Sequence, residues 1–259
     1  MKVSLEKLRS GLETIRKDFK SILAPDAPGI LEEAGVELVS SKQRYDEMKR
    51  RKELRDNDSW GYRIYKEKPL RFIDSGDNRG GKLSVDLYCD IQWREEEDLP
   101  FSQDICLRVW SSEQGLIYRE QWDSDRIEVE LSDRPKSKAE RVMHRMHFDK
   151  AEVGQQGPMY HLQFGGKPAE EIELCWFPEA IKLPRLVHAP MDLILTCQLI
   201  AANFYSETYA TIKKKTYWIG LVRHSQDHLL KNYYRKCLTN INDGKILLDE
   251  LWNSTNKAS

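Results

Sequence analysis

The hydrophobic pattern changes its period twice along the chain, and this constrains the fold more than any other feature of the 259-residue sequence. From Leu5 to Ile22, apolar residues recur every three or four positions, which is the spacing of one face of an α-helix. From Trp60 the period becomes two, as in strands with one buried face. After Pro184 the spacing is helical again. This order predicts an α+β fold, with an antiparallel sheet between two groups of helices.

Two helices are expected before the sheet. The first begins after Ser4, a typical N-cap, and ends before Pro25. The second spans residues 30–55 and ends in the densest basic run of the chain, at 49–55. The apolar stripe of the first helix suits packing on its own domain or binding of a partner helix. We expect a protein partner, or a second copy of the chain, to bind through this N-terminal helix.

About seven or eight strands are expected in the middle of the chain. Turn-rich or strongly polar segments, such as 74–81 and 94–100, separate them without helical spacing, which favours an antiparallel arrangement. The expected strands lie at 60–64, 83–93, 105–109, 127–131, 141–149, 160–165 and 171–177.

The last part of the chain predicts a cluster of helices. Residues 191–205 are nearly all apolar, as in a buried helix, and further helices are expected near 207–222, 226–240 and 244–253. Ser225 suits an N-cap, which would leave His224 outside the third of these four helices. The whole chain, 1–259, is expected to form a single domain. Within it lie a helical extension at 1–58, the sheet at 59–178 and the helical cluster at 179–259.

Composition excludes several broad classes of function. With 41 basic and 42 acidic residues, the chain has no overall charge that would attract nucleic acid or an anionic membrane. The five cysteines form no CxxC pair, which is typical of reduced thiols in the cytoplasm. No apolar stretch is long enough to span a membrane, and the charged start does not resemble a secretory signal. We expect a cytoplasmic protein without a membrane partner.

Four of the six histidines lie between positions 144 and 188. In the strand expected at 141–149, Arg145, His147 and Asp149 share one face because side chains alternate. In the returning strand, His161 and Gln163 share a face. If the two polar faces coincide, these five residues form one polar patch.

This patch suits catalysis, anion binding or a purely structural network. As a metal-independent nuclease or phosphodiesterase, it would use His147 and His161 as acid and base, with Asp149 orienting an imidazole. The phosphate would then contact Arg145 or Arg185. The structural alternative is a hydrogen-bonded network that joins a hairpin to the helices.

Binding without catalysis uses a related set of residues. Arg145 and Gln163 belong to the patch, whereas Arg185 and His188 precede a helix N-terminus, where anions are favoured. No metal site is expected because His144 and His147 lie on opposite strand faces. Without a nucleotide-binding or phosphate-loop motif, no cofactor is expected either. Basic and aromatic residues alternate near Lys213–Lys215, a composition shared by nucleic-acid sites and by amphipathic helices.

Three segments together resemble a family of uncharacterised bacterial proteins. They are Arg145-Met146-His147-Phe148-Asp149, then His161-Leu162-Gln163-Phe164-Gly165-Gly166, and Pro184-Arg185 with Pro190-Met191-Asp192 and Asn203-Phe204-Tyr205. The resemblance covers about a quarter of the chain. It implies a bacterial origin and a setting among anti-phage defence genes, but it transfers no activity and no catalytic residue.

These observations predict a non-enzymatic accessory or sensor subunit of a bacterial defence-type system that binds a partner protein, with nucleic acid as a second partner class. The aromatic content and the amphipathic N-terminal helix suit an interface. A metal-independent nuclease and a structural scaffold are the alternatives.

Overall fold

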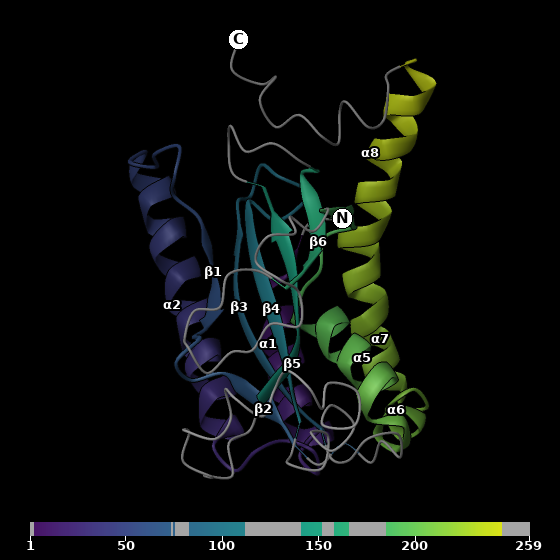
Figure 1. Cartoon of the computed structure of the whole chain (residues 1–259). Coiled ribbons are helices and arrows are strands. Elements are labelled where there is room, and N and C mark those ends of the chain that lie inside the picture. Colours follow the sequence, from purple (N-terminus) through teal and green to yellow (C-terminus); the bar gives the residue numbers. More distant parts are fainter. Residues whose placement is uncertain are drawn as a thin grey trace, which may run out of the picture.

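A computed structural model describes residues 3–73, 75, 83–111, 141–151, 158–165 and 185–244. It confirms the expected α+β architecture, in which a seven-stranded antiparallel sheet follows a pair of N-terminal helices and precedes a C-terminal group of helices (Figure 1). The expected strands at 127–131 and 171–177, and nearly all of the expected helix at 244–253, lie outside the described residues. No helix within the described ranges is long and apolar enough to cross a bilayer.

The first helix, α1 (Leu5–Asp18), begins where the sequence predicts, since Ser4 Oγ accepts a hydrogen bond of 3.4 Å from Lys7 N. The helix ends at Asp18, four residues before the apolar stripe ends at Ile22. The chain then turns from Phe19 to Leu23, and the side chains of these two residues are buried. The second helix, α2 (Ala27–Arg51), has Pro28 in its first turn.

The stripe of α1 packs inside the protein. Leu8, Leu12 and Ile15 are at most 6 % exposed. At Gly11 the helix approaches Ile194 so closely that an added Cβ would lie 2.8 Å from Ile194 Cδ1. The apolar stripe of the N-terminal helix is therefore part of the core.

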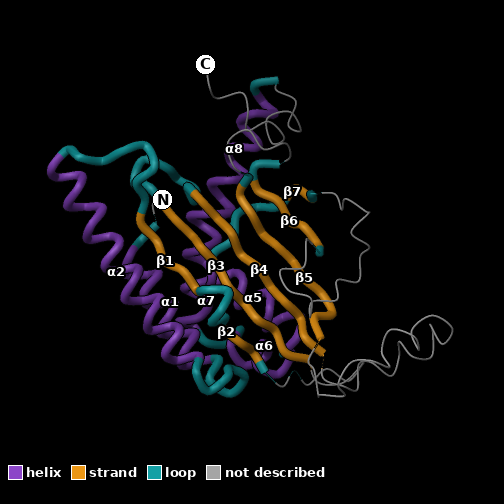
Figure 2. Tube along the Cα trace, turned by 60° about the vertical axis from the view of Figure 1, so that its left-hand side comes forward, coloured by secondary structure: helices purple, strands orange, loops and turns teal. Residues whose placement is uncertain are grey.

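The sheet runs in the order β1-β3-β4-β5-β6-β7, with the short β2 also pairing with β3, and every pairing is antiparallel (Figure 2). The strands are β1 (Trp60–Ile64), β2 (Leu70–Phe72), β3 (Leu83–Trp93), β4 (Ser102–Ser111), β5 (Arg141–Lys150), β6 (Tyr160–Phe164) and β7 (Leu186–Val187).

The two faces of the sheet differ in polarity because side chains alternate along each strand. One face is apolar: Leu87 and Ile91 of β3, and Ile105 and Leu107 of β4, are fully buried. Figure 2 shows the helices against one side of the sheet, and these strand residues belong to the same hydrophobic core as α1, α2 and α5 (Leu193–Phe204). The opposite face, which we call the polar face, carries acidic, basic and histidine side chains.

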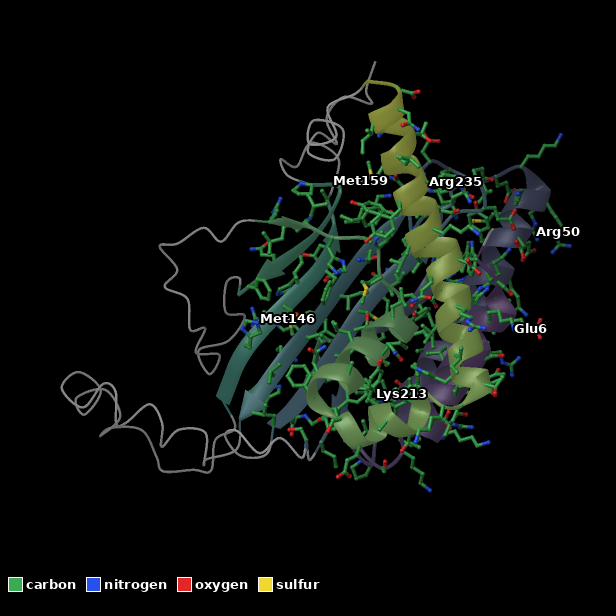
Figure 3. All side chains as sticks on the ribbon, turned by 90° about the vertical axis from the view of Figure 1, so that its right-hand side faces the viewer. Glu6, Arg50, Met146, Met159, Lys213 and Arg235 are labelled. Carbon is green, nitrogen blue, oxygen red and sulfur yellow. The ribbon has the colours of Figure 1, made fainter. Side chains whose placement is uncertain are left out.

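The C-terminal group contains α5, α6 (Ser206–Ile212), α7 (Thr216–Ser225), a π-helical turn (Gln226–Leu230) and α8 (Lys231–Asn242). Glu6, Arg50 and Arg235 mark the outer surfaces of α1, α2 and α8 (Figure 3). Ser225 has helical backbone angles and joins α7 to the π-helical turn. The expectation of a helix start at Ser225 is therefore wrong, because the helix is continuous there and includes His224.

Candidate active site on the polar face

The strand register brings most of the predicted patch together. Between β5 and β6, His147 lies opposite Gln163, and Asp149 lies opposite His161. Arg145 is two residues before His147 on the same strand, so it shares this face. These five residues therefore lie on the polar face of the sheet.

Strand β4 adds a residue that the sequence analysis missed. Asp104 lies directly opposite Asp149, and Cys106 lies opposite His147. One donor atom each from Asp104, His147 and Asp149 lie within 4.8 Å of one another. We call these three residues the Asp–His–Asp cluster. Asp104 is exposed and the other two are partly exposed, so the cluster is reachable from solvent.

The cluster lies in a row of ionisable residues that crosses the sheet. On β3, Asp90 lies opposite Asp104, and its Oδ2 is 2.6 Å from Arg63 Nε of β1. At the other end, Asp149 Oδ2 lies 4.0 Å from His161 Nε2. Asp104, between the other two carboxylates, forms no ion pair with a basic residue in the part of the chain that the structure describes. Negative charge is therefore concentrated on β4 and β5.

Burial and mutual repulsion change the proton affinity of the carboxyl groups. Burial, followed by the charge of Asp104, raises the pKa of Asp149 to about 7. Although the Asp104 residue is exposed, loss of water around its carboxyl group raises its pKa; a hydrogen bond with Asp149 opposes this shift and the charge of Asp90 adds to it. Because the two groups face each other, they titrate as a pair, and this pair holds a proton near neutral pH.

His147 is neutral near pH 7, since burial and the positive charge of Arg145 lower its pKa to about 4. Its Nε2 lies 3.6 Å from Cys106 Sγ. Burial raises the pKa of Cys106 to about 12, so this thiol is protonated and is a poor nucleophile. His147 is therefore suited to accept a proton or to bind a cation, but not to act as an acid.

Guanidinium groups lie beside the cluster. Arg145 is 4 % exposed and is close enough to lower the pKa of His147. The charge of Arg185 lowers the pKa of both Asp149 and His161, so this side chain also faces the site. Arg108, next to Arg145 across the strand pair, lies 3.9 Å from the buried carboxylate of Asp86.

His161 is buried, with Nδ1 3.1 Å from the carbonyl oxygen of Pro158. This geometry makes Nδ1 the donor and leaves Nε2 as the acceptor that faces Asp149. Burial lowers the pKa of His161, so His161 is also a poor candidate for the general acid at neutral pH.

An acidic side chain lies at the start of the buried helix, where an anion site was predicted. The Asp192 carboxylate caps α5, its Oδ1 accepting a 2.9 Å hydrogen bond from Leu195 N. An anionic side chain already occupies this helix N-terminus. The His188 ring packs on Phe148, whose side chain belongs to the apolar face, at 5.0 Å between centroids. His188 therefore lies apart from the Asp–His–Asp cluster.

His144 also lies apart, on the face opposite His147. Its ring is 5.3 Å from that of Phe164. These two histidines lie on opposite faces as expected from the sequence, and the carboxylate of Asp104 on β4 lies near His147.

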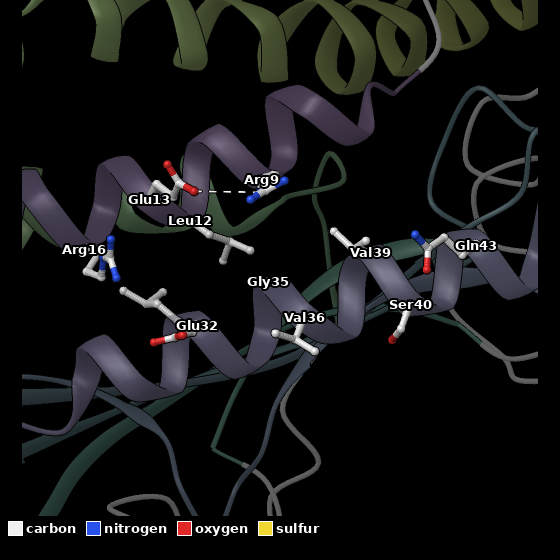
Figure 4. A pocket seen from close by; sticks show the side chains of 11 residues that line it. Arg9, Leu12, Glu13, Arg16, Glu32, Gly35, Val36, Val39, Ser40 and Gln43 are labelled. Atoms are coloured by element: carbon white, nitrogen blue, oxygen red, sulfur yellow. Dashed lines mark ion pairs between the residues drawn. The ribbon is translucent and has the colours of Figure 1, made fainter.

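A second surface feature lies between α1 and α2 (Figure 4). It is a groove of about 580 Å³ with Leu12, Leu31 and Val39 among its lining residues, and with Arg9 and Glu13, whose side chains lie 3.8 Å apart. Val36 at this groove is 65 % exposed.

Comparisons with protein-family models, with curated proteins and with solved structures each found no match. The resemblance to an uncharacterised bacterial family stays a prediction.

Proposed function

We propose that this protein hydrolyses a phosphodiester, in nucleic acid or a nucleotide, at the Asp–His–Asp cluster. The observation that carries the proposal is the direct opposition of Asp104 and Asp149 beside His147, which gives a carboxyl pair that holds a proton near neutral pH. Such a pair contains both a base and an acid under the same conditions, as general acid–base catalysis requires.

The neighbouring guanidinium groups favour a phosphate substrate. Arg145 belongs to β5 and its charge acts on His147, and Arg185, just before β7, acts through its charge on Asp149 and His161. Guanidinium groups form charge-assisted hydrogen bonds with phosphate oxygens and stabilise the charge that develops in the transition state. They would therefore hold the phosphorus atom beside the carboxyl pair.

The reaction follows from these positions. The oxygen of a water molecule forms a bond to phosphorus while the bond from phosphorus to the leaving oxygen breaks. The ionised member of the carboxyl pair accepts the proton of the water, and the protonated member donates its proton to the leaving oxygen. The pair returns to its starting charge, and the products are a phosphomonoester and an alcohol.

This assignment changes the roles expected from the sequence. His147 and His161 were the expected acid and base, but burial lowers the pKa of both and so disfavours the imidazolium form that a general acid needs. Asp149 was expected to orient an imidazole, and it is now the titrating group.

The test is hydrolysis of bis(p-nitrophenyl) phosphate and of labelled single-stranded DNA and RNA. Wild-type protein should cleave at least one of them, and Asp149→Asn should reduce the rate by roughly 100-fold or more. Asp227→Asn is the control, because Asp227 is an exposed carboxylate of the π-helical turn, 3.8 Å from Lys231 Nζ, and it should retain activity. No cleavage by the wild type, or equal rates for wild type and Asp149→Asn, would contradict the proposal.

A second candidate function is that of an accessory subunit that binds a partner protein, and the groove between α1 and α2 favours it. An amphipathic helix is the partner segment that fits an apolar groove with charged residues at its rim. In a pull-down from the native host, a helix-bearing partner should bind the wild type and lose binding to Val36→Glu. A partner retained equally by both would exclude this groove. Action within a defence system stays a prediction.

A further inference from the structure

The acidic residues of the cluster conflict with the substrate that we propose. A phosphodiester carries a negative charge, and Asp104 and Asp149 oppose each other directly, with Asp90 on the next strand. Like charges directly opposite in a sheet destabilise it. Two species can relieve this repulsion: a proton shared by the pair, or a bound cation.

The donor atoms of the cluster suit a cation. They are two carboxylates and an imidazole, and this combination binds divalent ions such as Mn²⁺ and Zn²⁺. Two donor atoms that each lie about 2.1 Å from one ion are at most about 4.2 Å apart. The donor atoms here lie within 4.8 Å of one another, so small side-chain rotations would complete the site.

Two further observations support the site. Asp149 Oδ1 is buried and has no hydrogen-bond partner within the described residues, although a buried carboxylate oxygen normally has one. Nε2 of His147 lies 3.6 Å from Cys106 Sγ, and with the imidazole hydrogen on Nε2 the other ring nitrogen is the one that can bind a cation. Both features leave acceptor atoms that a cation would satisfy.

We propose that Asp104, His147 and Asp149 bind one divalent cation. This inference rests on the proposed function for the nature of the substrate, but not for the cation site itself. Three protein ligands leave coordination positions open for water and for a phosphate oxygen, as in hydrolytic metal sites. The exposed Asp104 side gives the substrate access to them.

The test is titration of the metal-free protein with Mn²⁺ near pH 7.5, followed by calorimetry. The wild type should bind one ion, and Asp149→Asn and His147→Gln should each weaken binding by at least about tenfold. The matched control for His147→Gln is His144→Gln on the opposite face of β5, and it should bind as the wild type does. If the wild type binds no Mn²⁺, or if the cluster variants bind it as tightly as the control does, the inference is wrong.

The same samples separate this inference from the proposed function. Hydrolysis that persists in excess EDTA, with no Mn²⁺ binding, would support the carboxyl pair as acid and base and overturn the cation site. Mn²⁺ binding without hydrolysis of any tested phosphodiester would support the cation site and overturn the proposed function. If Asp149→Asn fails to fold, the comparison of Mn²⁺ binding by His147→Gln and by His144→Gln tests the cation site alone.

Discussion

Replacing Asp149 by asparagine should stabilise the protein at alkaline pH and have little effect at acidic pH. The amide has nearly the same shape as the carboxyl group but cannot ionise, so the variant lacks the repulsion with Asp104. Residues selected for function often reduce stability in this way.

The magnitude follows from the pKa of Asp149. The ordinary value of about 3.9 for an unfolded chain rises to about 7 in the folded protein, and each pKa unit corresponds to about 1.4 kcal/mol. Between these two values the folded state holds a proton that the unfolded state has lost, so stability falls as the pH rises. The loss is about 4 kcal/mol over the whole window, and roughly 3 kcal/mol of it lies above pH 5. Asp149 is 27 % exposed, so screening by solvent makes this an upper value.

The assay is urea unfolding of wild type and Asp149→Asn at about pH 5 and about pH 8 in metal-free buffer. Comparing the two proteins at each pH cancels the contributions of the histidines whose pKa is lowered by burial. From pH 5 to pH 8, the unfolding free energy of the variant should rise relative to that of the wild type by about 1–3 kcal/mol, within the upper value derived from the pKa of Asp149. If the two proteins keep a constant difference from pH 5 to pH 8, the argument for a proton-sharing carboxyl pair is refuted.

Three further substitutions test the packing that holds the site. Gly61→Ala should destabilise the protein by at least about 1–3 kcal/mol in urea unfolding, because the added Cβ would lie 2.0 Å from the carbonyl oxygen of Ile91. Leu107→Ala removes a fully buried side chain from the centre of β4 and should cost about 2–5 kcal/mol, measured by the same method. Asp192→Ala should lower the thermal midpoint through loss of the α5 cap, worth about 1–2 kcal/mol, and Asp192→Asn should retain most of that stability. An unchanged midpoint in Asp192→Ala would show that the cap contributes little.

The fold was largely predictable from the sequence because its hydrophobic periods are clear. The alternation from Leu83 to Trp93 gives β3 directly, and the period of three and four near the N-terminus gives α1. The exact ends were less predictable. The apolar stripe continues to Ile22, whereas α1 stops at Asp18, because buried side chains in a turn extend the pattern beyond the helix.

Only the part of the candidate site on β5 and β6 could be predicted from the sequence, because the rest depends on pairing with a strand that is distant in the sequence. The alternation within β5 and β6 placed Arg145, His147 and Asp149 on one face, since that follows from local geometry. The contribution of Asp104 depends on which strand lies beside β5 and in what register, and a long stretch of chain separates the two strands. The pKa values behind the proposed catalytic roles depend on burial, which periodicity alone does not give.

The expectation for the helix near His224 failed for a different reason. Serine is a common N-cap, but Ser225 is 2 % exposed and lies within a continuous helix, where tertiary packing outweighs the local preference.

The most direct measurement of the central claim is a crystal structure of the wild-type protein soaked in Mn²⁺, with data collected for anomalous scattering. We predict an anomalous peak within bonding distance of carboxylate oxygens of Asp104 and Asp149 and of a ring nitrogen of His147. A well-ordered polar face with no peak at these three side chains, or with a peak bound only by other residues, would contradict the cation site.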